Sequence, residues 1–172
     1  MNPVVWLTGL SSSGKSTIAY GVGNRLSEEG HRVSVLDADI IRQKLWPELG
    51  FSRWDREQNI ERLGFLARLF LSLDTIPIVA AVSPFAEARA RVRKSVSSFM
   101  EVYLRCPLEV LKKRDTKGIY GQLHRGEIRG VCGVDFLYEA PEAPELVIDT
   151  DKENIETSVS RVFEMVVGMT KA

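Results

Sequence analysis

The chain has 172 residues, of which 44% are hydrophobic and 27% are charged, a composition that is typical of one globular domain with a buried core. Basic and acidic residues number 23 each, so no net charge attracts nucleic acid or an anionic membrane. The longest apolar run, residues 76–82, is too short for a membrane span, and no signal peptide precedes it. Cys106 and Cys132 show neither metal-site spacing nor a disulfide framework, so we predict two inert thiols in a cytoplasmic protein.

The first predicted elements surround a phosphate-binding loop. Apolar residues 4–7 predict a buried strand, and residues 15–29, followed by Gly30, predict a helix. Between them, G-L-S-S-S-G-K-S-T at residues 9–17 fits the G-x-x-x-x-G-K-[S/T] pattern. Backbone N–H groups of such a loop surround a β-phosphate, Lys15 neutralises β- and γ-phosphate oxygens, and Ser16 binds Mg²⁺. The predicted nucleotide-binding residues are Gly9, Leu10, Ser11, Ser12, Ser13, Gly14, Lys15, Ser16 and Thr17.

Two carboxylates follow the second predicted strand, residues 32–36. Groups just beyond the carboxyl ends of parallel strands face the ligand in open α/β sheets. We therefore expect Asp37 to hold Mg²⁺ directly or through water, and Asp39 to accept a proton from an acceptor hydroxyl. The alternative is that either aspartate only caps the helix predicted over residues 40–45. Arg42 lies one turn beyond Asp39 and can reach the same ligand.

A long helix is predicted to begin near a cap formed by Ser52 and Asp55 and to end at about residue 73. Arg56 and Asn59 share one face near its start, where a helix end can meet an anion. Phe51 precedes the helix and either packs against its first turn or stacks on a base. The core face of this helix is marked by apolar residues at helical spacing, namely Ile60, Leu63, Leu66, Ala67 and Phe70.

A further buried strand, residues 76–82, brings Ser83 to the same edge of the sheet as the phosphate-binding loop. Ser83 is a candidate site hydroxyl, and the alternative is that it only caps the following turn at Pro84. Residues 87–94 are expected to form a solvated helix face because they carry four basic side chains, Arg89, Arg91, Arg93 and Lys94.

The remaining segments complete the predicted fold. A strand over residues 100–104 and a short helix over residues 107–114 precede a long irregular stretch, residues 115–144, whose composition is typical of a mobile flap over a phosphate-rich site. A strand over residues 145–150 and a helix from Ile155 close the chain. The alternation predicts one domain, residues 1–172, with a three-layer α/β/α sandwich around a five-stranded parallel sheet. Such a site would transfer a γ-phosphoryl group, stabilised by Lys15, Mg²⁺ and a flap arginine such as Arg114.

Over nearly its whole length the chain resembles the adenylyl-sulfate kinase (APS kinase) family. The matching stretches are V-W-L-T-G-L-S at 5–11, F-S-x-x-D-R-x-x-N-I at 51–60, V-S-P at 82–84, R-D-x-K-G at 114–118, G-E-I-x-G at 126–130 and Y-E-A-P-E-x-P-E-L at 138–146. The resemblance implies a phosphate-loop kinase fold, and transfer of the γ-phosphoryl group of MgATP to the 3′-hydroxyl of adenosine 5′-phosphosulfate in sulfate assimilation. It also implies a homodimer and raises association with ATP sulfurylase as a further option. By the same resemblance, the family's N-terminal leader is expected to be missing, since the first predicted strand begins at residue 4.

The resemblance also implies roles for individual residues. Phe51 matches a residue that stacks on the acceptor adenine, and Arg114 matches one that covers ATP. Ser83 matches the position of a phosphoserine intermediate, but in-line transfer needs no covalent step, so we expect Ser83 to orient the acceptor. The implied catalytic residues are Lys15, Asp39, Ser83 and Arg114. The implied substrate-binding residues are Asp39, Arg42, Phe51, Arg56, Asn59, Val82, Ser83, Lys117, Gly130 and Val131.

Some positions depart from the family pattern. Ser12 replaces a glycine, and a positive φ there would cost roughly 1 kcal/mol or more. Ala38 and Ile40 replace the glycine and asparagine of an Asp-Gly-Asp-Asn motif. Val131 replaces an aromatic ring opposite Phe51, at a cost of ~1 kcal/mol in stacking. Two alternatives therefore stay open: a kinase of another nucleotide or small hydroxyl metabolite, and a low-turnover nucleotide-binding partner of a sulfurylase.

Overall fold

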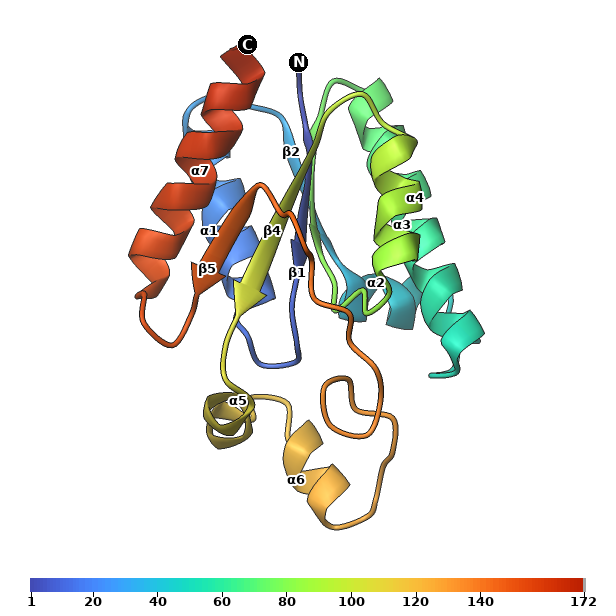
Figure 1. The fold of residues 1–172 in the computed structure, drawn as a ribbon. Coiled ribbons are helices and arrows are strands. Elements are labelled where there is room, and N and C mark those ends of the chain that lie inside the picture. Colours follow the sequence, from blue (N-terminus) through green and yellow to red (C-terminus); the bar gives the residue numbers. More distant parts are fainter. Residues whose placement is uncertain (172) are drawn as a thin grey trace.

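A computed structural model describes residues 1–171, and strands and helices alternate along the chain as the sequence predicts (Figure 1). In order, the elements are β1 (Val4–Thr8), α1 (Lys15–Glu28), β2 (Val33–Asp37), α2 (Ala38–Leu45), α3 (Arg53–Ser72), β3 (Ile76–Ala80), α4 (Ala86–Lys94), β4 (Phe99–Arg105), α5 (Leu108–Arg114), α6 (Ile119–His124), β5 (Leu146–Asp149) and α7 (Ile155–Lys171). Within these residues no helix combines the length and the apolar character needed to cross a bilayer.

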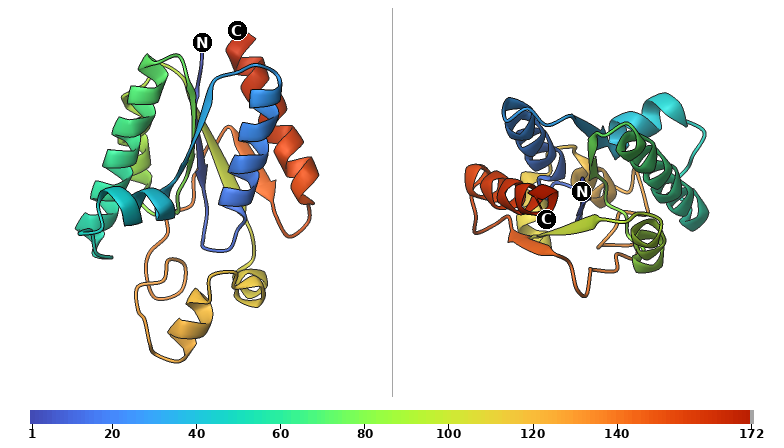
Figure 2. Two further views of the ribbon diagram at one scale, coloured as in Figure 1. Left: turned by 180° about the vertical axis from the view of Figure 1, so that it is seen from behind. Right: turned by 90° about the horizontal axis from the view of Figure 1, so that it is seen from above.

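The five strands form one parallel sheet in the order β2-β3-β1-β4-β5, with helices on both faces (Figures 1 and 2). Helices α1 and α7 cover one face, and α3 and α4 cover the other. This arrangement confirms the predicted three-layer sandwich. The central strand β1 lies between β3 and β4, so the loop that follows it leaves the sheet where the strand order reverses, the place at which open α/β sheets bind ligands.

Strand β1 supplies side chains to the core on both faces of the sheet, since successive residues of a strand point in opposite directions. Val5 and Leu7 pack in the core beneath α1 and α7, whereas Val4 and Trp6 pack in the core beneath α3 and α4. All four side chains are fully buried. A strand buried on both faces gives the phosphate-binding loop a rigid base.

Residues 115–144, called the flap below, are not irregular throughout, which corrects the sequence prediction. Helix α6 lies within them, and together with α5 the flap sits beyond the carboxyl ends of the strands (Figures 1 and 2). Leu111, Tyr120 and Val131 form a small hydrophobic cluster of their own there. The cluster gives the flap a core that joins α5, α6 and the segment near residue 131.

The basic run over residues 87–94 is not solvated throughout, which corrects a second prediction. Arg89 is only 3% exposed, and its Nε lies 2.7 Å from Oε1 of Glu101 on β4. Arg93 pairs with the same Glu101 and with Glu145. Glu101 could have indicated this burial from the sequence, because an acidic residue inside an otherwise apolar strand needs a buried cationic partner.

Candidate active site

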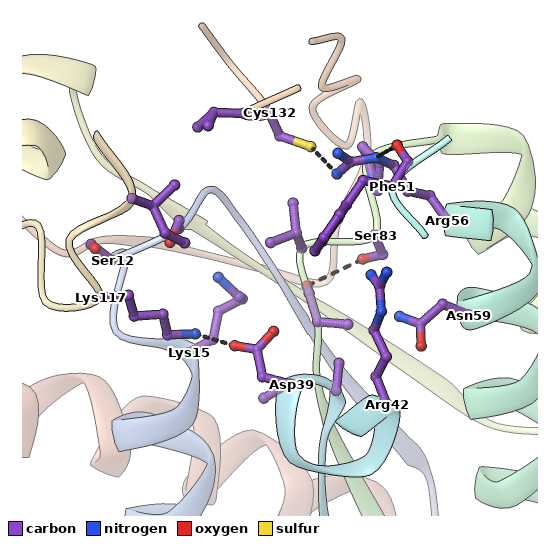
Figure 3. A pocket seen from close by; sticks show the side chains of 18 of the residues that line it. Ser12, Lys15, Asp39, Arg42, Phe51, Arg56, Asn59, Ser83, Lys117 and Cys132 are labelled. Atoms are coloured by element: carbon purple, nitrogen blue, oxygen red, sulfur yellow. Dashed lines mark hydrogen bonds and ion pairs between the residues drawn. The ribbon is translucent and has the colours of Figure 1, made fainter. Parts of the chain in front are cut away.

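A cavity of about 510 Å³ opens at the carboxyl ends of the strands, between the phosphate-binding loop, α2, α3, the end of β3 and the flap (Figure 3). It gathers most of the residues that the sequence singled out. The predicted residues that line it are Ser11, Ser12, Gly14, Lys15, Ser16, Thr17, Asp39, Arg42, Phe51, Arg56, Asn59, Val82, Ser83, Lys117, Gly130 and Val131. Those that do not line it are Gly9, Leu10, Ser13, Asp37 and Arg114.

The phosphate-binding loop has the backbone geometry of an anion cradle. Gly14 is the N-cap of α1 in a left-handed conformation, and no side chain caps the helix there. The first N–H groups of α1 are thus available to an anion, which the positive end of the helix also favours. Ser12 has φ +64, so the predicted strain at this replaced glycine is present, and its hydroxyl lies 3.2 Å from that of Thr116 in the flap.

Lys15 is buried beneath this loop without a direct carboxylate partner. Its ammonium donates to the Leu10 carbonyl at 2.7 Å and to the Ser13 hydroxyl at 3.5 Å. Burial, together with the charge of Lys117, lowers the pKa of Lys15 to about 8. A phosphate group beside Lys15 would favour its charged form and raise this pKa.

The two aspartates after β2 have different surroundings. Asp37 caps α2, because its Oδ1 accepts a hydrogen bond from the Asp39 N–H at 3.0 Å, which is the alternative weighed from the sequence. Asp39 extends into the cavity and forms an ion pair with Lys117 of the flap (Figure 3). The pair joins the first turn of α2 to the flap at the cavity.

Two guanidinium groups lie close to the ring of Phe51, on the side of the cavity formed by α2 and α3. The guanidinium of Arg42 lies 4.1 Å from the centre of its ring, and that of Arg56 lies 5.5 Å away. Arg42 also donates to the carbonyls of Leu49 and Gly50, which fixes it beside the ring. Because Phe51 remains 67% exposed, its ring can accept a further planar partner.

Arg56 connects α3 to the flap. It donates to the Phe51 carbonyl at 2.8 Å, to the Gly130 carbonyl at 2.6 Å and to Cys132 Sγ at 3.1 Å (Figure 3). Its guanidinium also lies 4.3 Å from the ring centre of Phe136. Sequence reasoning missed the contact of Cys132, which it took for an inert thiol, although the residue follows two positions that match the family flap.

Asn59 reaches the cavity from the next turn of α3. Its Oδ1 accepts a hydrogen bond from the Trp46 indole at 2.8 Å, which fixes the orientation of the amide. In Figure 3 the side chain lies beside Arg42. The predicted pair of Arg56 and Asn59 therefore does face one cavity.

The Ser83 hydroxyl is directed into the protein. It accepts a hydrogen bond from the Trp6 indole at 3.0 Å and donates to the Thr8 hydroxyl at 2.9 Å, and the residue is 3% exposed. Its φ of +42 is a strained value for serine. Thr8 in turn donates to the Val82 carbonyl at 2.7 Å, so the backbone at residues 82–83 is held from β1.

Arg114, which the resemblance predicts to cover ATP, does not line this cavity. Its guanidinium donates to the side chain and the carbonyl of Thr150, in the loop after β5. Tyr120 of α6, which the sequence did not single out, instead contacts the phosphate-binding loop by donating to the Ser11 carbonyl at 3.0 Å. Burial raises the pKa of Tyr120 to about 12, so this donor keeps its proton at neutral pH.

Comparisons with known proteins point to a single family. The family model described as adenylylsulphate kinase matches residues 1–149. A probable adenylyl-sulfate kinase of Bacillus subtilis (strain 168) is 47% identical over 165 residues, covering 95% of this chain and 84% of that protein. The structure of the Mycobacterium tuberculosis APS kinase CysC in complex with AMPPNP and APS has a TM-score of 0.92 at 37% identity, covering 96% of this chain and 97% of that one.

A hexameric APS kinase from Thiobacillus denitrificans is also similar, with a TM-score of 0.72 at 31% identity over 98% of this chain and 29% of that one. The family model spans most of the sequence, and the relatives align along almost all of it. These findings confirm the resemblance inferred from the motifs. The chain therefore belongs to the adenylylsulphate kinase family.

Proposed function

We propose that this chain transfers the γ-phosphoryl group of MgATP to the 3′-hydroxyl of adenosine 5′-phosphosulfate, giving 3′-phosphoadenosine 5′-phosphosulfate and ADP in sulfate activation. The observation that carries the proposal is one cavity of about 510 Å³ in which a phosphate-binding loop faces a cationic, aromatic surface under the flap. Positioning the two substrates and stabilising charge are the main tasks of a phosphoryl-transfer site.

The nucleotide half of the cavity is the loop and the start of α1. Backbone N–H groups from Ser11 to Thr17 would surround the β-phosphate, and Lys15 would neutralise the β- and γ-phosphate oxygens. Arg114, which lies with Thr150 outside the cavity, is proposed to cover another part of ATP, not the transferring group.

The residues present fit a magnesium ion held mainly by phosphate oxygens. Within residues 1–171 no group of three or more His, Cys, Asp or Glu side chains could hold a metal. The Ser16 hydroxyl and, through water, the Asp37 carboxylate are oxygen ligands of the kind that Mg²⁺ takes together with nucleotide phosphates. Bound there, the ion would neutralise charge that develops on the phosphate oxygens.

The acceptor half of the cavity is built around Phe51 and the two arginines beside it. Phe51 would stack on the adenine, while Arg42 and Arg56 would bind the phosphosulfate. Asp39 would accept the proton of the 3′-hydroxyl, and ligand binding would then exchange its ion pair with Lys117 for contacts with the substrate. Ser83 would hold the backbone beside the acceptor, since its hydroxyl is occupied by Trp6 and Thr8.

The test is chromatographic detection of 3′-phosphoadenosine 5′-phosphosulfate after incubation with MgATP and adenylyl sulfate, with Lys15→Ala as the blank. We expect product at roughly one turnover per second or faster, the range of small kinases. Product at the level of the blank, from a protein that still binds ATP, would overturn the acceptor assignment and call for a screen of other hydroxyl compounds.

A homodimer in the cytoplasm is proposed as the working form. Its support is three exposed apolar side chains on one face of α3, those of Trp54, Phe65 and Leu69, which are each at least 46% exposed. Both cysteines are free thiols, which supports a reducing compartment. Light scattering of the wild-type protein should give twice the mass of one chain. The Phe65→Glu variant should give the mass of one chain. A wild-type monomer would favour a different partner, such as a sulfurylase.

A further inference from the structure

A buried arginine outside the cavity joins the two segments that border its acceptor side. Arg89 of α4 donates through Nη1 to the Ser83 carbonyl at 2.7 Å and through Nη2 to the Glu139 carbonyl at 2.8 Å. Its Nε donates to Glu101 at 2.7 Å, so a buried carboxylate balances the buried charge. One planar guanidinium thus connects β4, the turn at residues 83–84 (called the Ser83 turn below) and the flap.

The Ser83 turn needs such a support. A serine at φ +42 is strained, and such a conformation persists only where the surroundings fix it. The Ser83 side chain is fixed from β1 by Trp6 and Thr8, whereas its carbonyl is fixed from α4 by Arg89. The second anchor is therefore independent of the first.

The flap returns to the core at the same place. The Glu139 N–H donates to the Pro84 carbonyl at 2.8 Å, and the Glu139 carboxylate accepts from the Ala86 N–H at 2.7 Å. Tyr138, the preceding residue, lies 3.1 Å from the Thr8 hydroxyl. The end of the flap and the Ser83 turn are consequently one hydrogen-bonded unit, with Arg89 beneath it.

We propose that Arg89 is a positioning residue for the acceptor, which sets the Ser83 turn and the end of the flap relative to each other. This inference rests on the proposed acceptor site. The flap carries Gly130 and Cys132 to Arg56, so a shift at Glu139 is transmitted to the surface that binds the phosphosulfate. The phosphate-binding loop makes none of its hydrogen bonds to Arg89, so ATP binding is expected to depend on Arg89 much less.

Arg89→Lys tests the proposal. Lysine keeps a positive charge beside Glu101, but a single ammonium does not span the carboxylate and both carbonyls. We expect the KM for adenylyl sulfate to rise at least tenfold and the KM for ATP to change less than twofold. Amide hydrogen exchange of residues 126–139 should become faster, and because that readout needs no turnover, it separates failure of this inference from failure of the proposed reaction.

Arg93→Lys is the matched control, because Arg93 pairs with the same Glu101 and with Glu145 on the outer side of α4. It should leave both KM values and the exchange of residues 126–139 unchanged. Glu139→Ala removes a solvent-accessible contact to Ala86 and should raise the KM for adenylyl sulfate by a smaller factor than Arg89→Lys does. This variant replaces Arg89→Lys as the test if Arg89→Lys does not fold. Equal effects of Arg89→Lys and Arg93→Lys, or an unchanged acceptor KM in Glu139→Ala, would overturn the proposal.

Discussion

The phosphate-binding loop and the flap border the same cavity, yet they are held in different ways. The loop is shaped first by neighbours in the sequence, since Gly14 is the N-cap of α1 and Lys15 donates to Leu10, five residues away; the flap adds contacts to Ser11 and Ser12. The flap is fixed by distant partners, since Lys117 pairs with Asp39 across 78 positions and Gly130 is bound by Arg56 across 74. The proposed nucleotide half of the site is therefore the more local structure, whereas the proposed acceptor half depends mainly on contacts between distant parts of the chain.

The largest expected effect is at Asp39, where the two halves meet. Asp39→Asn removes the proposed base and should lower kcat by ~10²–10⁴, the usual contribution of general-base catalysis. Product formation by chromatography measures it. Lys117→Met breaks the same ion pair but keeps the carboxylate, so it should lower kcat much less. Equal losses in the two variants would mean that the ion pair, and not the base, matters.

Arg56→Ala tests whether binding of adenylyl sulfate can be weakened without weakening the binding of ATP. Hydrogen bonds to a charged group contribute about 1.5–3 kcal/mol, so the KM for adenylyl sulfate should rise by roughly 10- to 100-fold. The KM for ATP should stay within about twofold, because Arg56 contacts Phe51 and the flap. Initial rates at varied concentrations of each substrate give both constants. Equal increases in the two KM values would contradict the acceptor role.

The nucleotide half can be tested through the charge of Lys15. With a pKa of about 8 in the free protein, roughly a quarter of Lys15 side chains are protonated at pH 8.5. Nucleotide phosphates raise this pKa, so binding at pH 8.5 should take up about half a proton or more, and binding below pH 7 should take up almost none. Calorimetry in buffers of different ionisation enthalpy measures the proton uptake. Lys15→Arg should abolish the uptake, because arginine is always charged. Proton uptake that persists in this variant would show that a group other than Lys15 takes up the proton.

The smallest effect is expected at Val131, on the flap side of the acceptor cavity. Val131→Phe offers a second ring opposite Phe51, and stacking worth ~1 kcal/mol would lower the KM for adenylyl sulfate about fivefold. Val131 also packs against Leu111 and Tyr120, so the larger side chain should lower the melting temperature slightly. Steady-state kinetics and thermal unfolding measure the two effects. An unchanged or higher KM would show that the ring does not reach the acceptor.

The contrast between the two regions also explains what the sequence could predict. The loop, the alternation of strands and helices and the cap at Ser52 follow from local patterns, and the structure contains all of them. Helix α6 was missed because its N-cap is Gly118, which has no capping side chain; the carboxylate that accepts from its first N–H groups is that of Asp115, three residues earlier, and Tyr120 packs on α5. The burial of Arg89 was missed because its partner Glu101 lies on β4. The sequence of α4 by itself, with four basic residues, is typical of a solvent-exposed helix.

Two of the three tryptophans report on the acceptor half without any label. The indole of Trp46 is hydrogen-bonded to Asn59, and the indole of Trp6 is hydrogen-bonded to Ser83, whereas Trp54 lies in solvent on α3. Indole emission responds to such hydrogen bonds and to nearby charge. The chain thus carries its own optical probes on one side of the cavity, and the side that binds the triphosphate has none among residues 9–17.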